Sequence, residues 1–246
     1  MRYDVWAPRY ARIREEFGFP LAREELAAAT LESLLKPSDR AAPLERLRRR
    51  IQGRDVVVVG LAPDVGPPPV WRLPSSYQRP ALIAADGAAE RCLEGGLVPD
   101  IIVTDLDGPV PSEVTANQRG SLVLVHAHGD NVPALERWVP EFPGELAGSW
   151  AGAPRSALID VGGFTDGDRA AYLAEELGAN RILLWGFDFR TVGDVGEPDR
   201  SRKLAKLSWA QRLLEQLSEE GRAPLLLWAR DGSLTPYGRK RVESTR

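Results

Sequence analysis

The sequence predicts an α/β protein with a mostly parallel, doubly wound sheet, helices on both faces of that sheet and a helical segment at the N-terminus. Three observations predict this fold class. Short apolar runs recur from residue 56 onward, without the polar–apolar alternation of half-exposed strands. Helix-like segments separate several of these runs, and such alternation is typical of parallel sheets. The first 50 residues lack these runs and repeat apolar residues at helical spacing.

The N-terminal segment, residues 1–52, is expected to be helical. Its apolar residues recur every three or four positions, as on one helix face: Trp6, Tyr10, Ile13 and Phe17. The arginine-rich stretch 45–51 has the pattern of an amphipathic helix with a solvated basic face.

The region 53–232 is expected to form the α/β domain that carries the function, followed by a C-terminal tail, 233–246. Strands are predicted at 56–59, 81–85, 101–103, 122–125, 157–161, 182–185 and 225–228. Helices are predicted at 88–94, 133–138, 166–177 and 202–220. The proline-rich stretch 63–80 is predicted to be a long loop.

Composition narrows the function classes. A length of 246 residues with 43% hydrophobic residues suffices for a buried core and excludes a disordered chain. The formal net charge of −3 argues against a dedicated nucleic-acid binder, because such proteins carry a basic excess. One cysteine excludes an intramolecular disulfide framework and suits a reducing cytosol. The sequence has no apolar stretch of membrane-spanning length and no secretory pattern, so we expect a cytoplasmic protein without a membrane partner.

Acidic residues follow nearly every predicted strand: Asp86, Asp105, Asp107, Asp130, Asp166 and Asp188. The carboxyl ends of parallel strands share one edge of the sheet, where ligands bind in such folds. Carboxylates gathered there repel one another, and a divalent cation would compensate their charge. Asp105 and Asp107 can face one ion together, and oxygen ligands suit Mg²⁺. The alternative is a turn in which these aspartates accept backbone N–H groups.

Both histidines of the chain lie in the segment HAHGDN, 126–131. His126, His128 and Asp130 would share one side of a continuing strand, a pattern that could bind zinc or iron. In the interpretation we favour, Asp130 lies near the metal and the histidines are polar site residues.

The segment GGFTDGDRA, 162–170, combines a helix start with a glycine pair. Thr165 and Asp168 match a capping box, and Asp166 suits the positive end of the helix dipole. The glycine pair, which includes Gly163, also permits a ligand to approach backbone N–H groups. Both interpretations can hold together.

A polar loop at 190–198 precedes a basic helix start. Lys203 and Lys206, two of only four lysines, lie on one helix face. Next to a loop that could close as a lid, they would stabilise a polyphosphate opposite an acidic metal site. The alternative is a solvated basic helix start. Gly60, after the first strand, is a weak sign of a phosphate loop, because neither the P-loop nor the dinucleotide signature is present.

Taken in order, these motifs resemble the archaeal-type 6-hydroxymethyl-7,8-dihydropterin diphosphokinases, the MptE-like family. The matching stretches are ADGA around Asp86, GGLVPDIIVTDLDG (95–108), HAHGDN (126–131), GGFTDGDRA (162–170), GFDF (186–189) and KLAKL (203–207). The N-terminal aromatic pattern is similar too, so that the resemblance spans most of the chain. One departure is the loop at 60–65, GLAPDV, which lacks a serine and a glycine of the family's usual Gly-x-Gly-Pro-Ser-Leu.

The resemblance implies Mg²⁺-dependent transfer of diphosphate from ATP to 6-hydroxymethyl-7,8-dihydropterin, with release of AMP, in folate or tetrahydromethanopterin biosynthesis. By similarity to thiamine diphosphokinases, it implies that Asp86, Asp105, Asp107 and Asp130 are Mg²⁺ or Mg-ATP site residues. Of these, Asp105, Asp107 and Asp130 are the expected metal ligands, and with Lys203 they are the expected catalytic residues. The expected nucleotide or phosphate contacts are Gly60, Asp86, Gly87, Gly163, Thr165, Asp166, Arg202 and Lys206. The expected substrate contacts are His126, His128, Asn131, Phe164 and Asp188.

Three alternatives remain open at this point. The acceptor could be another alcohol such as thiamine, and a sugar-nucleotide-dependent transferase of the flagellin-modification type could also use two aspartates for a metal. A nonenzymatic nucleotide-binding regulator would keep the pockets without needing the lysines. We further expect a homodimer.

Overall fold

The computed structural model describes residues 3–73, 79–191 and 199–238, in which four helices come first and strands and helices then largely alternate. The strands are β1 (Asp55–Val59), β2 (Ala81–Ala85), β3 (Ile101–Thr104), β4 (Leu122–His126), β5 (Leu146–Ser149), β6 (Leu158–Ile159), β7 (Arg181–Trp185), β8 (Leu225–Trp228) and β9 (Leu234–Pro236). The helices are α1 (Tyr3–Phe17), α2 (Leu21–Leu34), α3 (Pro37–Arg40), α4 (Pro43–Ile51), α5 (Ala88–Glu94), α6 (Val110–Gln118), α7 (Val132–Trp138), α8 (Asp166–Glu176) and α9 (Asp199–Glu220), with short 3-10 turns η1 (Val70–Arg72) and η2 (Val139–Glu141).

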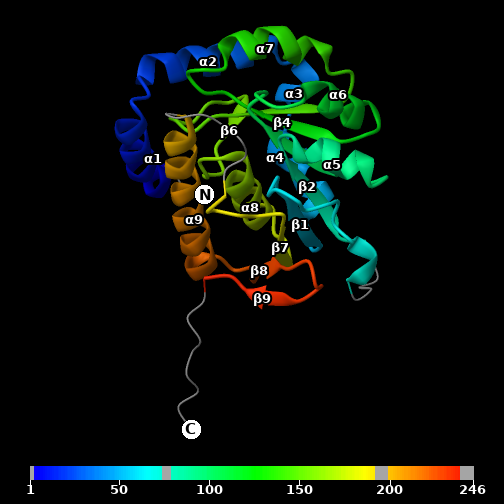
Figure 1. The fold of residues 1–246 in the computed structure, drawn as a ribbon. Coiled ribbons are helices and arrows are strands. Elements are labelled where there is room, and N and C mark those ends of the chain that lie inside the picture. Colours follow the sequence, from blue (N-terminus) through cyan, green and yellow to red (C-terminus); the bar gives the residue numbers. More distant parts are fainter. Residues whose placement is uncertain (1–2, 74–78, 192–198, 239–246) are drawn as a thin grey trace.

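Within this described part, the strands form one sheet in the order β6-β5-β4-β3-β2-β1-β7-β8-β9. Every neighbouring pair is parallel except β8 with β9. The predicted α/β class, the mostly parallel sheet and the N-terminal helical segment are therefore confirmed (Figure 1).

Alternate residues of each strand pack against helices on opposite faces of the sheet. Val56 and Val58 of β1 join the core beneath α1, α4, α8 and α9. Val57 and Val59 join the core beneath α2, α5, α6 and α7. Helices cover both faces of the sheet, so burial of each aliphatic side chain stabilises the fold by about 1.5–3 kcal/mol, whichever face it lies on. This explains why the strands appear in the sequence as unbroken apolar runs.

Among the described residues, two strands and one helix were not predicted from the sequence patterns. β5 reads Leu-Ala-Gly-Ser, whose small residues do not form an apolar run, although all four are buried. β9 is a short antiparallel addition at the edge of the sheet. Helix α6 has the sequence VPSEVTANQ, in which proline, β-branched residues and asparagine weaken the helical signal. Most of the polar loop predicted before α9 falls at 192–198, outside the described residues.

The sheet has a switch point at β1. Strands β2 to β6 extend from one side of β1, and the chain then returns through α8 to place β7 on the other side. Loops that leave neighbouring strands in opposite directions open a crevice at the carboxyl edge, where ligands bind in doubly wound folds. The fold therefore directs attention to the ends of β1 and β7.

The N-terminal helices lie on both faces of the sheet and approach its carboxyl edge. Helix α1 runs beside α9 (Figure 1), where Arg9 contacts Glu220 at 3.0 Å and the Trp209 indole N–H donates to Glu16 at 2.8 Å. Helix α2 belongs to the opposite face and packs with α7. In the described residues, none of the helices has the length and apolarity needed to cross a membrane.

Candidate active site

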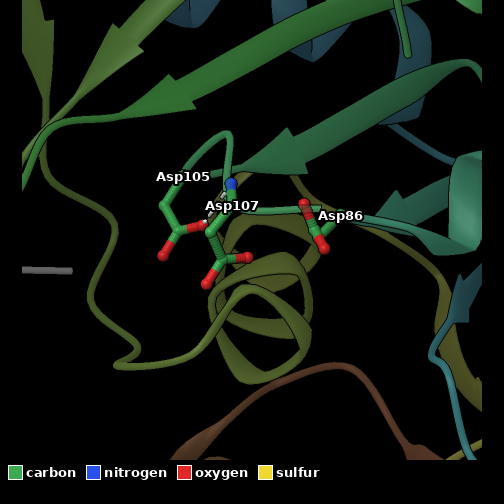
Figure 2. Close-up of side chains that lie close together, drawn as sticks. All are labelled: Asp86, Asp105 and Asp107. Carbon is green, nitrogen blue, oxygen red and sulfur yellow. Dashed lines mark hydrogen bonds between the residues drawn. The ribbon is translucent and has the colours of Figure 1, made fainter. Parts of the chain in front are cut away.

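Three carboxylates meet at the carboxyl ends of β2 and β3. Asp86 follows β2, and Asp105 and Asp107 follow β3; one carboxylate oxygen from each lies within 4.8 Å of the others. Figure 2 shows Asp105 and Asp107 on one short loop, with Asp86 beside them from the neighbouring strand end. We call these three residues the carboxylate cluster.

The local backbone brings Asp86 into the cluster. Asp86 has φ +47°, in the left-handed region, and its carboxylate lies so close to Gly108 that a Cβ there would collide with it. The Thr104 hydroxyl donates to Asp86 Oδ1 at 3.1 Å and accepts the Leu106 N–H at 2.9 Å. The glycine that ends TDLDG is therefore needed for the close approach of the Asp86 side chain.

Burial and mutual repulsion perturb the ionisation of the cluster. Burial, followed by the charges of Asp105 and Asp86, raises the pKa of Asp107 to about 7. Burial also raises the pKa of Asp86. For Asp105, burial raises the pKa, but the hydrogen bond from His128 helps to outweigh that effect, so that its pKa is lowered. Glu113, fully buried on α6, has a pKa well above its ordinary value because of burial and the Asp86 charge.

The donor set fits a hard divalent cation such as Mg²⁺. It consists of carboxylate oxygens alone, and these lie close enough together to share one ion. After burial, repulsion from Asp105 and Asp86 raises the pKa of Asp107, and a bound cation would offset that repulsion. Lys206 on α9 lowers the pKa of both Asp105 and Asp107, which places a basic side chain on the same side of the sheet.

The loop after β4, residues 126–131, contacts the cluster through His128. Its Nε2 lies 3.2 Å from Asp105 Oδ2, and its Nδ1 accepts the Asp130 N–H at 3.4 Å. Since Nδ1 accepts, the neutral ring carries its proton on Nε2 and donates to Asp105. His126 is buried, with Nδ1 3.0 Å from the Ser149 hydroxyl, and burial holds its pKa well below the ordinary value.

The other two polar residues of this loop, Asn131 and Asp130, have different surroundings. The Asn131 amide nitrogen donates to the carbonyls of Asp105 and His126, both at 2.8 Å, and its oxygen accepts the His128 N–H at 3.1 Å. Both of its donors are thus used within the protein. Asp130 lies outside the carboxylate cluster, with its side chain 52% exposed and 3.9 Å from the Arg23 guanidinium. Asp86, expected from the resemblance to belong to the Mg²⁺ or Mg-ATP site, is the third member of the carboxylate cluster.

A pocket of about 320 Å³ adjoins the cluster at the switch point. It lies between the loops after β1 and β7, with the start of α8 and one face of α9 as further walls. Asp86 and Asp166 belong to its lining. Its apolar walls are provided by Leu61, Ala62, Phe187, Phe189, Leu207 and Ala210.

Two glycines predicted to contact phosphate also allow close packing of these loops. A Cβ on Gly60 would lie 2.6 Å from the Gly186 carbonyl oxygen, and one on Gly87 would lie 2.8 Å from Leu61 Cδ1. The Arg91 guanidinium donates to the carbonyls of Gly60 at 2.7 Å and Ala62 at 3.0 Å. Arg91, which no sequence pattern singled out, therefore fixes the loop that departs from the usual family sequence.

The start of α8 forms the predicted capping box between Thr165 and Asp168. The fully buried Asp168 also accepts the Phe164 N–H at 2.6 Å. Gly163 has φ +83°, and a Cβ there would collide with the backbone of Arg169, so helix packing alone requires a glycine at this position. Asp166 faces the pocket, and burial together with Asp105 and Asp86 raises its pKa well above the ordinary value.

The basic residues of α9 have different surroundings. Lys206 is half-buried near the cluster, whereas Lys203 is exposed. The Arg202 guanidinium lies over the rings of Phe17 and Phe19, 5.6 and 5.4 Å from their centroids. Phe164 belongs to the same aromatic group, with its ring centroid 5.1 Å from that of Phe17.

Asp188 lies at the pocket wall and stabilises a turn. Its Oδ1 accepts the N–H groups of Arg190 at 2.8 Å and Thr191 at 3.2 Å. Hydrogen bonds from these two residues lower its pKa.

Comparisons with known proteins agree with the resemblance seen in the sequence. The profile of the family described as "6-hydroxymethylpterin diphosphokinase MptE-like" matches residues 31–194. A protein of Methanothermobacter thermautotrophicus named 6-hydroxymethyl-7,8-dihydropterin pyrophosphokinase is 36% identical over 240 residues, covering 93% of this chain and 100% of that protein. Proteins with the same name from Pyrococcus furiosus and Methanocaldococcus jannaschii are 39% and 31% identical, over 92% and 89% of this chain and 98% and 97% of theirs.

Among solved structures, a MAf glycosyltransferase from Magnetospirillum magneticum AMB-1 shows a weaker likeness. It is 16% identical with a TM-score of 0.42, over 78% of this chain and 34% of that one, so this chain spans about a third of its length.

Proposed function

The chain belongs to the MptE-like family of 6-hydroxymethylpterin diphosphokinases, and from this premise we propose that it transfers diphosphate from ATP to 6-hydroxymethyl-7,8-dihydropterin with release of AMP. The observation that carries the proposal is the carboxylate cluster beside a pocket at the switch point of the sheet. An acidic site next to a partly apolar crevice suits a metal-bound polyphosphate attached to a planar base. The product would enter folate or tetrahydromethanopterin biosynthesis.

Asp86, Asp105 and Asp107 would hold Mg²⁺. When bound, the ion neutralises phosphate charge at the reacting group, which is the main requirement of phosphoryl transfer. His128 and Asn131 keep Asp105 in place for this purpose, through its side chain and its carbonyl respectively.

The pocket would receive the nucleoside, with the phosphates directed toward the cluster past Lys206. Lys206 is favoured over the exposed Lys203 for the phosphate contact because it already acts electrostatically on Asp105 and Asp107. The pterin hydroxyl attacks the β-phosphorus of ATP, a new P–O bond forms, and the bond from that phosphorus to the α-phosphate oxygen breaks. AMP departs with the electron pair, and Asp166 accepts the hydroxyl proton.

The test is product formation with purified chain, ATP, Mg²⁺ and 6-hydroxymethyl-7,8-dihydropterin, followed by chromatography of AMP and pterin diphosphate. We expect equal amounts of both products, and none after chelation of Mg²⁺. Thiamine serves as the competing acceptor. Turnover with thiamine alone would make the chain a different diphosphokinase, and tight nucleotide binding without turnover of any alcohol would favour a regulator. The expected homodimer is checked by sedimentation of the same sample.

A further inference from the structure

We propose that Glu24, in the N-terminal helical segment, is a positioning residue for the reaction, because it holds the loop 126–131 in the place where His128 can orient Asp105. This inference rests on the proposed function for its kinetic part. It assigns a role to α2, a helix that contributes none of the cluster carboxylates.

Glu24 is buried and uses both carboxylate oxygens. Its side chain is 2% exposed, although it lies in the first turn of α2. Oε2 accepts the Tyr10 hydroxyl at 2.8 Å and Oε1 accepts the Gly129 N–H at 3.0 Å. A carboxylate withdrawn from water is costly unless hydrogen-bonded, so these contacts make the burial tolerable.

The fit between α2 and the loop leaves no room at Gly129. A Cβ at that position would lie 2.8 Å from Arg23 Cβ and 3.1 Å from Glu24 Oε1. The next residue, Asp130, has an oxygen 3.9 Å from the Arg23 guanidinium. Two consecutive residues of α2 thus contact two consecutive residues of a loop more than one hundred positions away in sequence.

From Gly129 the contacts continue to the cluster. His128, directly before Gly129, has Nε2 3.2 Å from Asp105 Oδ2. Asn131 accepts the His128 N–H and donates to the Asp105 carbonyl. If the loop were released at Gly129, the contact of His128 with the Asp105 side chain and the contact of Asn131 with the Asp105 carbonyl would therefore be lost together.

The nucleoside pocket has no part in this chain of contacts. Its walls come from the loops after β1 and β7, Ala85 and Asp86 at the end of β2, and helices α8 and α9. Loss of the Glu24 anchor should consequently weaken Mg²⁺ binding and lower kcat, while the KM for ATP, measured at saturating Mg²⁺, stays near its wild-type value. A general loss of folded protein would not produce that split.

The experiment compares Glu24→Ala with Glu24→Gln, which keeps an oxygen for the Gly129 N–H. We expect Glu24→Ala to lower kcat and raise the Mg²⁺ concentration for half-maximal rate by about tenfold or more, and Glu24→Gln to recover most of both. Glu25→Ala removes a neighbouring exposed carboxylate from the same helix and is the matched control, expected to behave as wild type. Gly129→Ala disturbs the same contact from the loop side, with Glu24 intact, and should reproduce the defect.

Amide hydrogen exchange of residues 126–131, measured without substrate, tests the anchor independently of activity. We expect faster exchange at Gly129 in Glu24→Ala and wild-type rates in Glu25→Ala. Unchanged exchange, or a kcat loss that Glu24→Gln shares in full, would overturn the proposal. Should the wild-type chain form no AMP, the proposed function fails, and exchange together with calorimetric Mg²⁺ binding decides the role of Glu24.

Discussion

The loops that follow β3 and β4 carry polar motifs of the same kind, yet the structure uses them differently. In the β3 loop, Asp105 and Asp107 present carboxylates to a common point. In the β4 loop, His126 and Asn131 are buried and bonded within the protein, and Asp130 is exposed beside Arg23. Of the β4 loop, His128 alone reaches a cluster carboxylate with its side chain, and it does so as a hydrogen-bond donor to Asp105.

The difference shows what residue spacing leaves undetermined. Positions i and i+2 share a side in both loops only while the backbone stays extended. In TDLDG, Leu106 has φ +67° and the cluster depends on Gly108 accommodating Asp86. In HAHGDN, the side chain of Asn131 closes the loop on itself. The loop after β3 supplies the negative charge of the site, and the loop after β4 supplies hydrogen bonds that keep the site rigid.

The largest expected effect is a difference in activity between substitutions in the two loops. Asp107→Asn should lower kcat about 10³-fold, because a metal ion contributes several kcal/mol of charge stabilisation and each 1.4 kcal/mol corresponds to a factor of ten. Asp130→Asn should cost less than about fivefold, as expected for an exposed pair. Steady-state rates of AMP formation measure both. Similar losses in the two variants would mean that Asp130 also approaches the metal.

A second prediction asks which lysine of α9 serves the cluster. Lys206→Ala should lower kcat/KM for ATP about 100-fold, because a charge that acts on Asp105 and Asp107 is lost from the phosphate path. Lys203→Ala, at the exposed position, is the control and should lose less than about tenfold. The reverse order would assign the phosphate contact to Lys203.

A third prediction concerns stability, where the β4 loop should be the more sensitive. Asn131→Ala removes three hydrogen bonds of a buried amide and should lower the free energy of unfolding by about 2–3 kcal/mol. Urea denaturation measures the change. Asp107→Asn, the counterpart in the β3 loop, should not destabilise the metal-free protein, because it relieves repulsion. Equal destabilisation by both substitutions would contradict the proposed difference between the loops.

The smallest expected effect is a pH dependence that belongs to the β3 loop. The pKa of Asp107 is raised from 3.8 to about 7, so between these values the folded chain holds a proton that the unfolded chain has released. Metal-free stability should therefore fall as the pH rises from about 4 to about 7. Added Mg²⁺ should stabilise the protein more at about pH 8 than at about pH 5, since binding competes with that proton.

Thermal melts of wild type and Asp107→Asn, with and without Mg²⁺, check this prediction. The variant should show a flatter pH profile and a smaller Mg²⁺ shift. The prediction would be contradicted if the Tm of the metal-free wild type rose from about pH 4 to about pH 7 because of the cluster carboxylates.

The fold was largely predictable because burial on both faces leaves an unambiguous pattern in runs such as 56–59 and 182–185. The site was predictable in part. Asp105 and Asp107 are neighbours in sequence, whereas Asp86 joins them only because β2 pairs with β3. Glu24 and Arg91 gave no local signal, since their roles arise from contacts with distant loops. Sequence spacing predicts which side of a strand each side chain faces, whereas the register between strands decides which side chains meet.

The crossing of the N-terminal helices from one sheet face to the other has a consequence for synthesis. Helix α1 packs on the face of α8 and α9, and α2 packs on the opposite face. Both helices leave the ribosome well before the strands that they cover, and Glu24 is translated 105 residues ahead of Gly129. The contact between Glu24 and the loop after β4 can therefore form only once residue 129 has been synthesised. The anchor of the β4 loop is thus missing from any shorter stretch of the chain, and this part of the site is complete only after strands β1 to β4 have been synthesised.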